Sequence, residues 1–108
     1  MLAYNIPVEA TLDVIGGKWK VVIMCHLIKG DKRTSELKRL MSGITQKMLT
    51  QQLRELEQDG VLKRDIYEQV PPKVVYSLTE YGWSLRPILD SMCAWGEQHV
   101  ELTSNISK

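Results

Sequence analysis

The sequence lacks the long apolar runs that place a protein in or across a membrane. Nowhere in its 108 residues does an uninterrupted apolar stretch approach the length of about 18 residues that a spanning helix requires. Its first residues have neither a basic start nor an extended apolar run, so they do not resemble a secretory signal. We therefore expect no membrane segment and a cytoplasmic location.

Motifs typical of enzymes are also missing. No glycine-rich phosphate loop, paired-carboxylate motif or cofactor fingerprint occurs in the sequence. Cys25 and His26 are adjacent, so on a helix their side chains point about 100° apart. Cys93 and His99 are six residues apart, not the three or four that share a helix face. We therefore expect no enzyme activity, no cofactor and no metal site.

Cysteine is rare, and its placement gives no sign of a disulfide framework. Cys25 and Cys93 lie within apolar helical patterns and form no CxxC motif. Free thiols are typical of a reducing compartment. We expect both residues to be buried in the core as small hydrophobic side chains.

What the sequence does contain is typical of one small globular domain, which we place at residues 1–108. Apolar residues make up 44% and charged residues 25% of the chain. A core of this size is marginal, so association with a second copy would help it. The net charge is +1, which taken whole argues against a nucleic-acid-binding protein.

The charges, however, are unevenly distributed. Residues 29–54 hold seven basic and two acidic residues, whereas residues 55–108 hold five basic and nine acidic ones. Such asymmetry between parts of a chain indicates a nucleic-acid partner that the total charge conceals.

Apolar periodicity and turn residues divide the chain into helices and strands. Thr45 is a good N-cap for the amphipathic fourth helix, and Pro87 should bend or break the last one. Thr34 or Ser35 can cap the short third helix. The predicted helices cover residues 7–15, 18–28, 34–41, 46–59 and 79–102, and the predicted strands cover residues 61–67 and 74–78.

This order of elements predicts the fold class. A short helix, a tight turn and an amphipathic helix form a helix-turn-helix over about residues 34–59. The hairpin that follows, over about residues 61–78, would be its wing. We therefore predict an α+β, mainly α, winged helix-turn-helix with a long C-terminal helix for dimerisation.

The polar face of the fourth helix carries side chains that can hydrogen-bond base edges and phosphates. The alternative is an ordinary solvated face, but the helix-turn-helix order favours DNA. Lys18 and Lys20 add a basic patch, and Lys63 and Arg64 either reach DNA from the wing or solubilise the sheet edge. The predicted DNA-binding residues are Lys18, Thr45, Gln46, Lys47, Thr50, Gln51, Arg54 and Lys73.

The last helix has an apolar stripe that is either intramolecular core or an interface. A small core cannot easily cover both this helix and the apolar first one, so we expect the two to form a twofold dimer interface. The predicted interface residues are Leu12, Leu85, Leu89, Met92 and Trp95. Such a dimer would place two fourth helices in major grooves roughly 34 Å apart on a pseudo-palindrome.

Several long motifs resemble those of HxlR-type winged-helix transcriptional regulators. The resemblance spans about residues 6–100. The matching segments are PVEATLDVIGGKWK at residues 7–20, GITQKMLTQQLRELE at 43–57, DG at 59–60, VPPKVVYSLTEYG at 70–82 and AWG at 94–96.

The resemblance implies a homodimeric bacterial DNA-binding regulator of the broader MarR-like group. The segment from Thr45 to Arg54 matches the family's recognition helix, and Lys73 falls in the matching wing. Some relatives sense electrophiles or oxidants through a cysteine just before the proline of the opening motif. That position is Ile6 here, which argues against sensing by that route.

Alternatives remain at this stage. A winged helix can serve as a protein-interaction module, since fold alone does not fix function, and a thiol enzyme or metal sensor would need its cysteines and histidines to cluster. Our prediction is a sequence-specific regulator that binds double-stranded DNA as a homodimer and is associated with the nucleoid when bound. A small-molecule or redox effector stays open.

Overall fold

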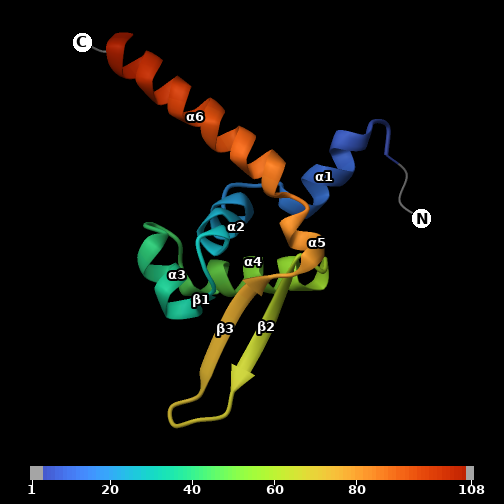
Figure 1. Cartoon of the computed structure of the whole chain (residues 1–108), viewed down its shortest axis with the longest axis vertical. Coiled ribbons are helices and arrows are strands. Elements are labelled where there is room, and N and C mark those ends of the chain that lie inside the picture. Colours follow the sequence, from blue (N-terminus) through green and yellow to red (C-terminus); the bar gives the residue numbers. More distant parts are fainter. Residues whose placement is uncertain (1–3, 107–108) are drawn as a thin grey trace.

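The computed structural model describes residues 4–106 and the side chains of residues 4–104, so the ends of the domain predicted over residues 1–108 lie outside the described part. Figure 1 shows the predicted elements in their predicted order, with one strand added and the last helix divided in two. The helices are α1 (Pro7–Ile15), α2 (Lys20–Ile28), α3 (Thr34–Leu40), α4 (Gln46–Gln58), α5 (Glu80–Trp83) and α6 (Arg86–Ile106). The strands are β1 (Lys32–Arg33), β2 (Leu62–Tyr67) and β3 (Lys73–Leu78).

The sheet is antiparallel and has the strand order β1-β3-β2. In β2 and β3, Leu62 lies opposite Leu78 and Tyr67 opposite Lys73, which forms the predicted hairpin. The additional strand β1 pairs Lys32 with Tyr76 along the other edge of β3. With α3 and α4 as the helix-turn-helix and the hairpin as the wing, the predicted fold class is confirmed.

The core lies between α2, α4 and the base of the sheet. On α4, Leu49, Leu53 and Leu56 are buried, because spacings of four and three residues place them in one row. Met48, an apolar residue of the same helix, is exposed because it lies about 100° around the helix from Leu49.

One predicted helix start and one predicted cap differ from the structure. The second helix begins at Lys20 rather than Lys18, after the bend that follows Gly17. The N-cap of the third helix is Arg33, whereas we predicted Thr34 or Ser35. The carboxylate of Glu36 accepts a hydrogen bond from the Arg33 backbone N–H at 2.9 Å, so a side chain inside the helix satisfies that donor.

The predicted long last helix is interrupted, as Pro87 indicated. The short helix α5 begins after Thr79, whose hydroxyl accepts a hydrogen bond from the Gly82 N–H at 3.0 Å. Helix α6 then starts at Arg86, which places Pro87 in its first turn, where a missing N–H costs no helical hydrogen bond. No helix among residues 4–106 has both the length and the apolar character needed to cross a bilayer.

Helix α6 has two apolar faces, which changes the predicted interface. Leu89 is 1% exposed and belongs to the core of its own chain, and Leu85 is half-buried against that core. Leu89 is therefore not an exposed interface residue, and for it the intramolecular alternative was the correct one, whereas the half-buried Leu85 stays a prediction. Ile88, Met92 and Trp95 lie on the other face and are 43%, 48% and 67% exposed.

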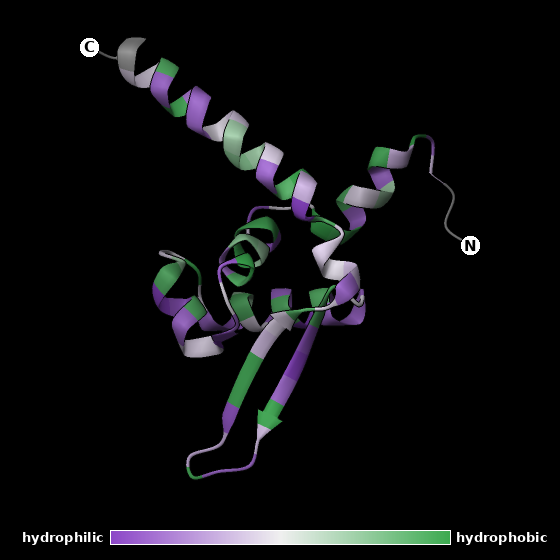
Figure 2. Cartoon of the chain, viewed as in Figure 1, coloured by the Kyte–Doolittle hydropathy of each residue, from purple (hydrophilic) through white to green (hydrophobic). Residues whose placement is uncertain are grey.

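The apolar faces and the wing lie at opposite ends of the molecule. In Figure 1, α1 and α6 project from one end, whereas the hairpin extends from the other. Figure 2 shows that apolar residues recur along both projecting helices. Leu12 on α1 is 56% exposed, so both helices present apolar surface outside the core.

Candidate nucleic-acid interface

The turn between α3 and α4 sets the direction in which α4 leaves the core. Gly43 adopts a φ of +91°, a conformation that L side chains rarely take. Thr45 then caps α4 as predicted, because its hydroxyl oxygen accepts a hydrogen bond from the Met48 N–H at 3.1 Å. With Leu49 and Leu53 buried beneath, the opposite side of α4 faces solvent.

That outer side collects the side chains that the sequence predicted. Five of the predicted residues line one open hollow along the helix, and Thr45 lies at its start. The amide of Gln46 donates to the Thr50 hydroxyl at 3.3 Å. No acidic residue occurs in α4 before Glu55. The five residues are Gln46, Lys47, Thr50, Gln51 and Arg54.

An ion pair beneath this face was not expected. Lys20 is buried, and its ammonium donates to Glu55 Oε1 at 2.8 Å, joining α2 to α4. Lys20 therefore does not belong to the basic surface patch that we predicted with Lys18. The hydrogen bond from Lys20 lowers the pKa of Glu55, and a further one from Gln51 acts in the same direction. The Lys20–Glu55 pair thereby joins α4 to the neighbouring helix α2.

Lys73 lies near the tip of the wing, next to the loop that joins β2 and β3. It starts β3 opposite Tyr67, and its ammonium is 5.5 Å from the centroid of the Tyr67 ring. Lys73 also shares a small groove with Arg33 and Ser35 at the start of α3. Arg33 is thus a basic neighbour of Lys73 that we did not predict as a DNA-binding residue. Its strand β1 has only two residues, too few to show the alternation of apolar and polar side chains that reveals a strand.

The other basic candidates lie apart from this groove. Lys18 is exposed in the connection between α1 and α2, where its ammonium lies 4.6 Å from the centroid of the Trp19 ring. Arg64 on β2 lies 3.7 Å from the carboxylate of Glu57. Lys63 is exposed on the same strand. The predicted DNA-binding residues therefore fall into separate places: those of α4 lie together on one face, and Lys73 lies beside Arg33. Lys18 lies apart from both.

The expectation that both cysteines are buried in the core is wrong, although Cys25 packs against the core. Cys93 is exposed and Cys25 half-buried, and their sulfurs lie 3.9 Å apart. Burial, with a contribution from the hydrogen bond to Cys93, raises the pKa of Cys25 to about 11. Over residues 4–106, no three His, Cys, Asp or Glu side chains gather as a metal-binding group.

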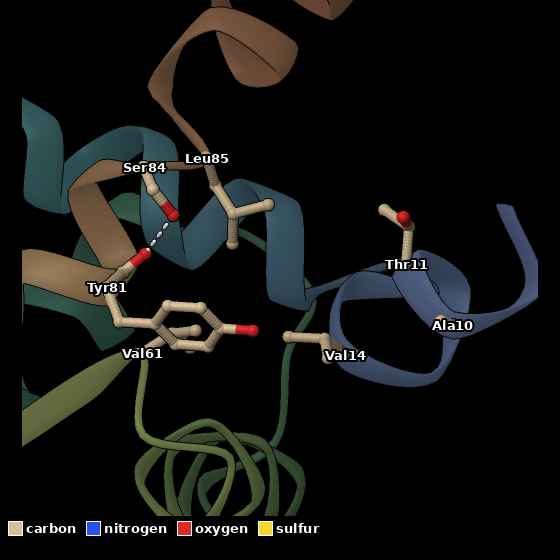
Figure 3. A pocket seen from close by; sticks show the side chains of 7 residues that line it. All are labelled: Ala10, Thr11, Val14, Val61, Tyr81, Ser84 and Leu85. Atoms are coloured by element: carbon tan, nitrogen blue, oxygen red, sulfur yellow. Dashed lines mark hydrogen bonds between the residues drawn. The ribbon is translucent and has the colours of Figure 1, made fainter. Parts of the chain in front are cut away.

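A small apolar pocket lies between α1 and α5 (Figure 3). The Tyr81 ring extends across it toward Val14, and the hydroxyl of Ser84 donates to the Tyr81 carbonyl. Its volume is about 170 Å³. Sites that enclose drug-sized ligands usually exceed about 300 Å³, so this pocket does not favour an effector of that size.

Comparison with known proteins gives consistent results. The family model of the HxlR-like helix-turn-helix matches residues 14–104. The HTH-type transcriptional regulator YtcD of Bacillus subtilis (strain 168) is 73% identical over 97 residues, which cover 90% of this chain and 77% of that protein.

Solved structures agree in fold. A crystal structure of an HTH-type transcriptional regulator ytcD has a TM-score of 0.85 at 69% identity, covering 89% of this chain and 98% of that one. The redox regulator HypR in its reduced form has a TM-score of 0.86 at 55% identity, covering 93% of this chain and 99% of that one. These relatives are regulators and not enzymes. The chain belongs to the HxlR-like helix-turn-helix family and is a transcriptional regulator with a helix-turn-helix DNA-binding domain.

Proposed function

We propose that this regulator binds a pseudo-palindromic operator as a homodimer and reads its sequence with α4. The observation that carries the proposal is the outer side of α4, where amide, hydroxyl and cationic side chains share one face with no carboxylate before Glu55. Amides and hydroxyls exchange hydrogen bonds with base edges, and cations bind phosphate or guanine. A protein-interaction module would instead favour a neutral or apolar face.

Each side chain has a role that follows from its chemistry. Gln46, Thr50 and Gln51 read base edges in the major groove, because they both donate and accept hydrogen bonds. Lys47 and Arg54 bind phosphate or guanine. Thr45 holds the N-terminus of α4, where free backbone N–H groups can also face a phosphate.

The wing and the approach to α2 add contacts that do not depend on sequence. Lys73 and Arg33, which share a groove, bind backbone phosphates beside the major groove that α4 occupies. Lys18 binds phosphate from the connection before α2. Bound in this way, the protein would act on the nucleoid in the cytoplasm.

Dimerisation is supported by apolar surface that the single chain leaves exposed. Leu12 on α1 and Ile88, Met92 and Trp95 on α6 are all exposed to solvent. A patch of large apolar side chains is unfavourable in water and is removed by a second copy related by a twofold axis. The wing extends from the other end of the chain, which leaves α4 and the wing free for DNA (Figure 1).

The experiment is selection of genomic DNA fragments by the purified protein, followed by hydroxyl-radical footprinting on an enriched fragment. We expect an inverted repeat with two protected half-sites centred about one helical turn, roughly 34 Å, apart. Enrichment of fragments without a repeat, or a single protected half-site, would contradict the dimeric arrangement. No enrichment at low salt would contradict sequence-specific binding.

A further inference from the structure

One face of α6 packs against the core through Leu89 and carries Cys93 one turn further along the helix. The sulfur of Cys93 lies beside that of Cys25 on α2. Leu89 and Cys93 are spaced four residues apart, so they lie in one row along α6, and Leu85 precedes this row just before the helix begins. Because Leu89 is buried, this row faces the chain's own domain. Cys25 on α2 meets the end of the row, and the two sulfurs lie 3.9 Å apart although 68 residues separate them in sequence.

The two thiols differ in their surroundings in a way that suits stepwise oxidation. Cys93 is exposed, so a dissolved oxidant reaches it directly. Cys25 is half-buried and within reach of the Cys93 sulfur, which places it to react with an oxidised Cys93 before a second oxidant molecule does. Burial raises the pKa of Cys25 to about 11, so Cys25 is a thiol at neutral pH and does not compete with Cys93 for the oxidant.

We propose that Cys25 and Cys93 are a redox modification site that forms a reversible disulfide between α2 and α6 on exposure to a peroxide. The Cys93 thiolate attacks one peroxide oxygen, the O–O bond breaks, and Cys93 becomes a sulfenic acid while the other oxygen leaves as water after taking a proton. The Cys25 sulfur, losing its proton to solvent, then attacks the Cys93 sulfur and displaces hydroxide, which leaves as water. In total, two thiols lose two electrons and two protons, and hydrogen peroxide is reduced to two water molecules.

The proposed disulfide joins two different helices, so its formation affects how they pack. A disulfide requires a sulfur–sulfur distance of about 2.05 Å, so closure from 3.9 Å draws the first half of α6 toward α2. Helix α2 is itself joined to α4 by the Lys20–Glu55 ion pair. Oxidation therefore fixes α6 against α2 and, through the ion pair, against α4. The exposed apolar side chains Ile88, Met92 and Trp95 lie on this fixed helix.

The test uses the purified, fully reduced protein and hydrogen peroxide. After treatment, the thiols are alkylated in denaturant, and the chain is examined by intact mass and by non-reducing electrophoresis. We expect both cysteines to be protected from alkylation, in a species that migrates as a single chain, and both to become reactive again after dithiothreitol. Cys25→Ser and Cys93→Ser should each prevent the protected single-chain species.

Two outcomes of the alkylation experiment would overturn the proposal. One is a wild-type protein whose two thiols stay open to alkylation after peroxide treatment, and the other is a disulfide that forms only between two chains. Thermal unfolding supplies a separate readout, at one protein concentration throughout. We expect oxidation to raise the melting temperature of the wild type by more than about 5 °C, since the bond closes a long loop in the unfolded chain, but not that of Cys25→Ser.

Equal melting temperatures for the oxidised and reduced wild type would contradict a cross-link that holds α6 against α2. Each readout reports sulfur chemistry or stability and not DNA binding. Its result therefore stands whether or not the proposed operator is found.

Discussion

At the scale of single residues, the helix that carries the candidate DNA-binding residues is tied to the core by one ion pair. The buried Lys20 on α2 donates to the carboxylate of Glu55 on α4 at 2.8 Å. A buried ammonium needs such a partner, because an unpaired charge away from water is costly. Glu55 therefore contributes to stability by pairing with Lys20 and joins α4 to α2.

The Lys20–Glu55 pair predicts a specific loss of stability in acid. Because the pKa of Glu55 is lowered below its usual value of 4.5, its ionised form is favoured in the folded state. The resulting stability is present above the unfolded pKa and is lost as the pH falls through the folded one. We expect Glu55→Gln to be less stable than wild type at neutral pH, and to lose less stability than wild type on acidification below 4.5, measured by urea unfolding.

The control for this change is Glu68→Gln, which removes an exposed carboxylate from the wing loop. It should keep the wild-type acid profile. If Glu55→Gln and the control follow the same profile, the ion pair does not contribute as described.

In the proposed complex Lys73 binds a phosphate and no base, so its loss should weaken binding to all DNA duplexes alike. We expect Lys73→Ala to bind the operator and an unrelated duplex less tightly by similar factors. The slope of log K against log salt should fall by about one, since one phosphate contact is lost. Fluorescence anisotropy over a salt series measures both. Arg86→Ala, which removes a cation at the start of α6, should leave the slope unchanged.

At the scale of elements, the turn of the helix-turn-helix rests on one glycine. Gly43 has a φ of +91°, and a Cβ added there would meet no atom within 4 Å, so the cost of a side chain is conformational and not steric. We expect Gly43→Ala to lower the free energy of unfolding by about 1–2 kcal/mol, measured by urea unfolding. Ser42→Ala, at the exposed neighbouring position, should leave stability close to wild type, and equal stability of the two variants would contradict the role of Gly43.

Helices and strands whose apolar residues repeat at a regular spacing could be predicted from the sequence, and those without such a repeat could not. Helix α4 was predicted because Leu49, Leu53 and Leu56 repeat at helical spacing and Thr45 is a good cap. Strand β1 has two residues, too few to show alternation. On α6, apolar residues occupy two adjacent faces, and sequence alone does not indicate which of the two the core covers.

For the functional residues, too, the sequence predicts local patterns but not contacts between distant segments. The α4 residues could be predicted because they share one helix face, whereas the Lys20–Glu55 and Cys25–Cys93 contacts join residues 35 and 68 positions apart. Such contacts depend on how helices pack. No local pattern around Lys20 or Cys25 distinguishes them from an exposed lysine or a core cysteine.

At the scale of the whole molecule, the two ends of the chain have different surfaces. The net charge of +1 conceals a basic segment at residues 29–54, which includes α3 and most of α4. The end with α1 and α6 presents apolar side chains instead. A near-neutral protein can therefore have a basic face for DNA and a separate apolar face for a second copy.

The apolar face predicts the effect of a charge on dimerisation. Trp95 is 67% exposed in the single chain, so Trp95→Asp should leave the core intact and shift the protein toward monomer in analytical ultracentrifugation. Val70→Asp, which places the same charge on the exposed wing loop, should not. An unchanged dimer in Trp95→Asp would place the interface elsewhere. Leu89→Asp cannot replace this test, because Leu89 is buried in the single chain and its loss would unfold the protein.

The central claim is that α4 reads the operator sequence, and the most direct test is the ratio of affinities for a selected operator and a scrambled duplex at one salt concentration. We expect Gln46→Ala/Gln51→Ala to reduce this ratio by about tenfold or more, since each lost base contact is worth roughly 1–3 kcal/mol, while binding to the scrambled duplex stays near wild type. Gln98→Ala, on α6, should keep the wild-type ratio. A double variant that also keeps the wild-type ratio would contradict the claim.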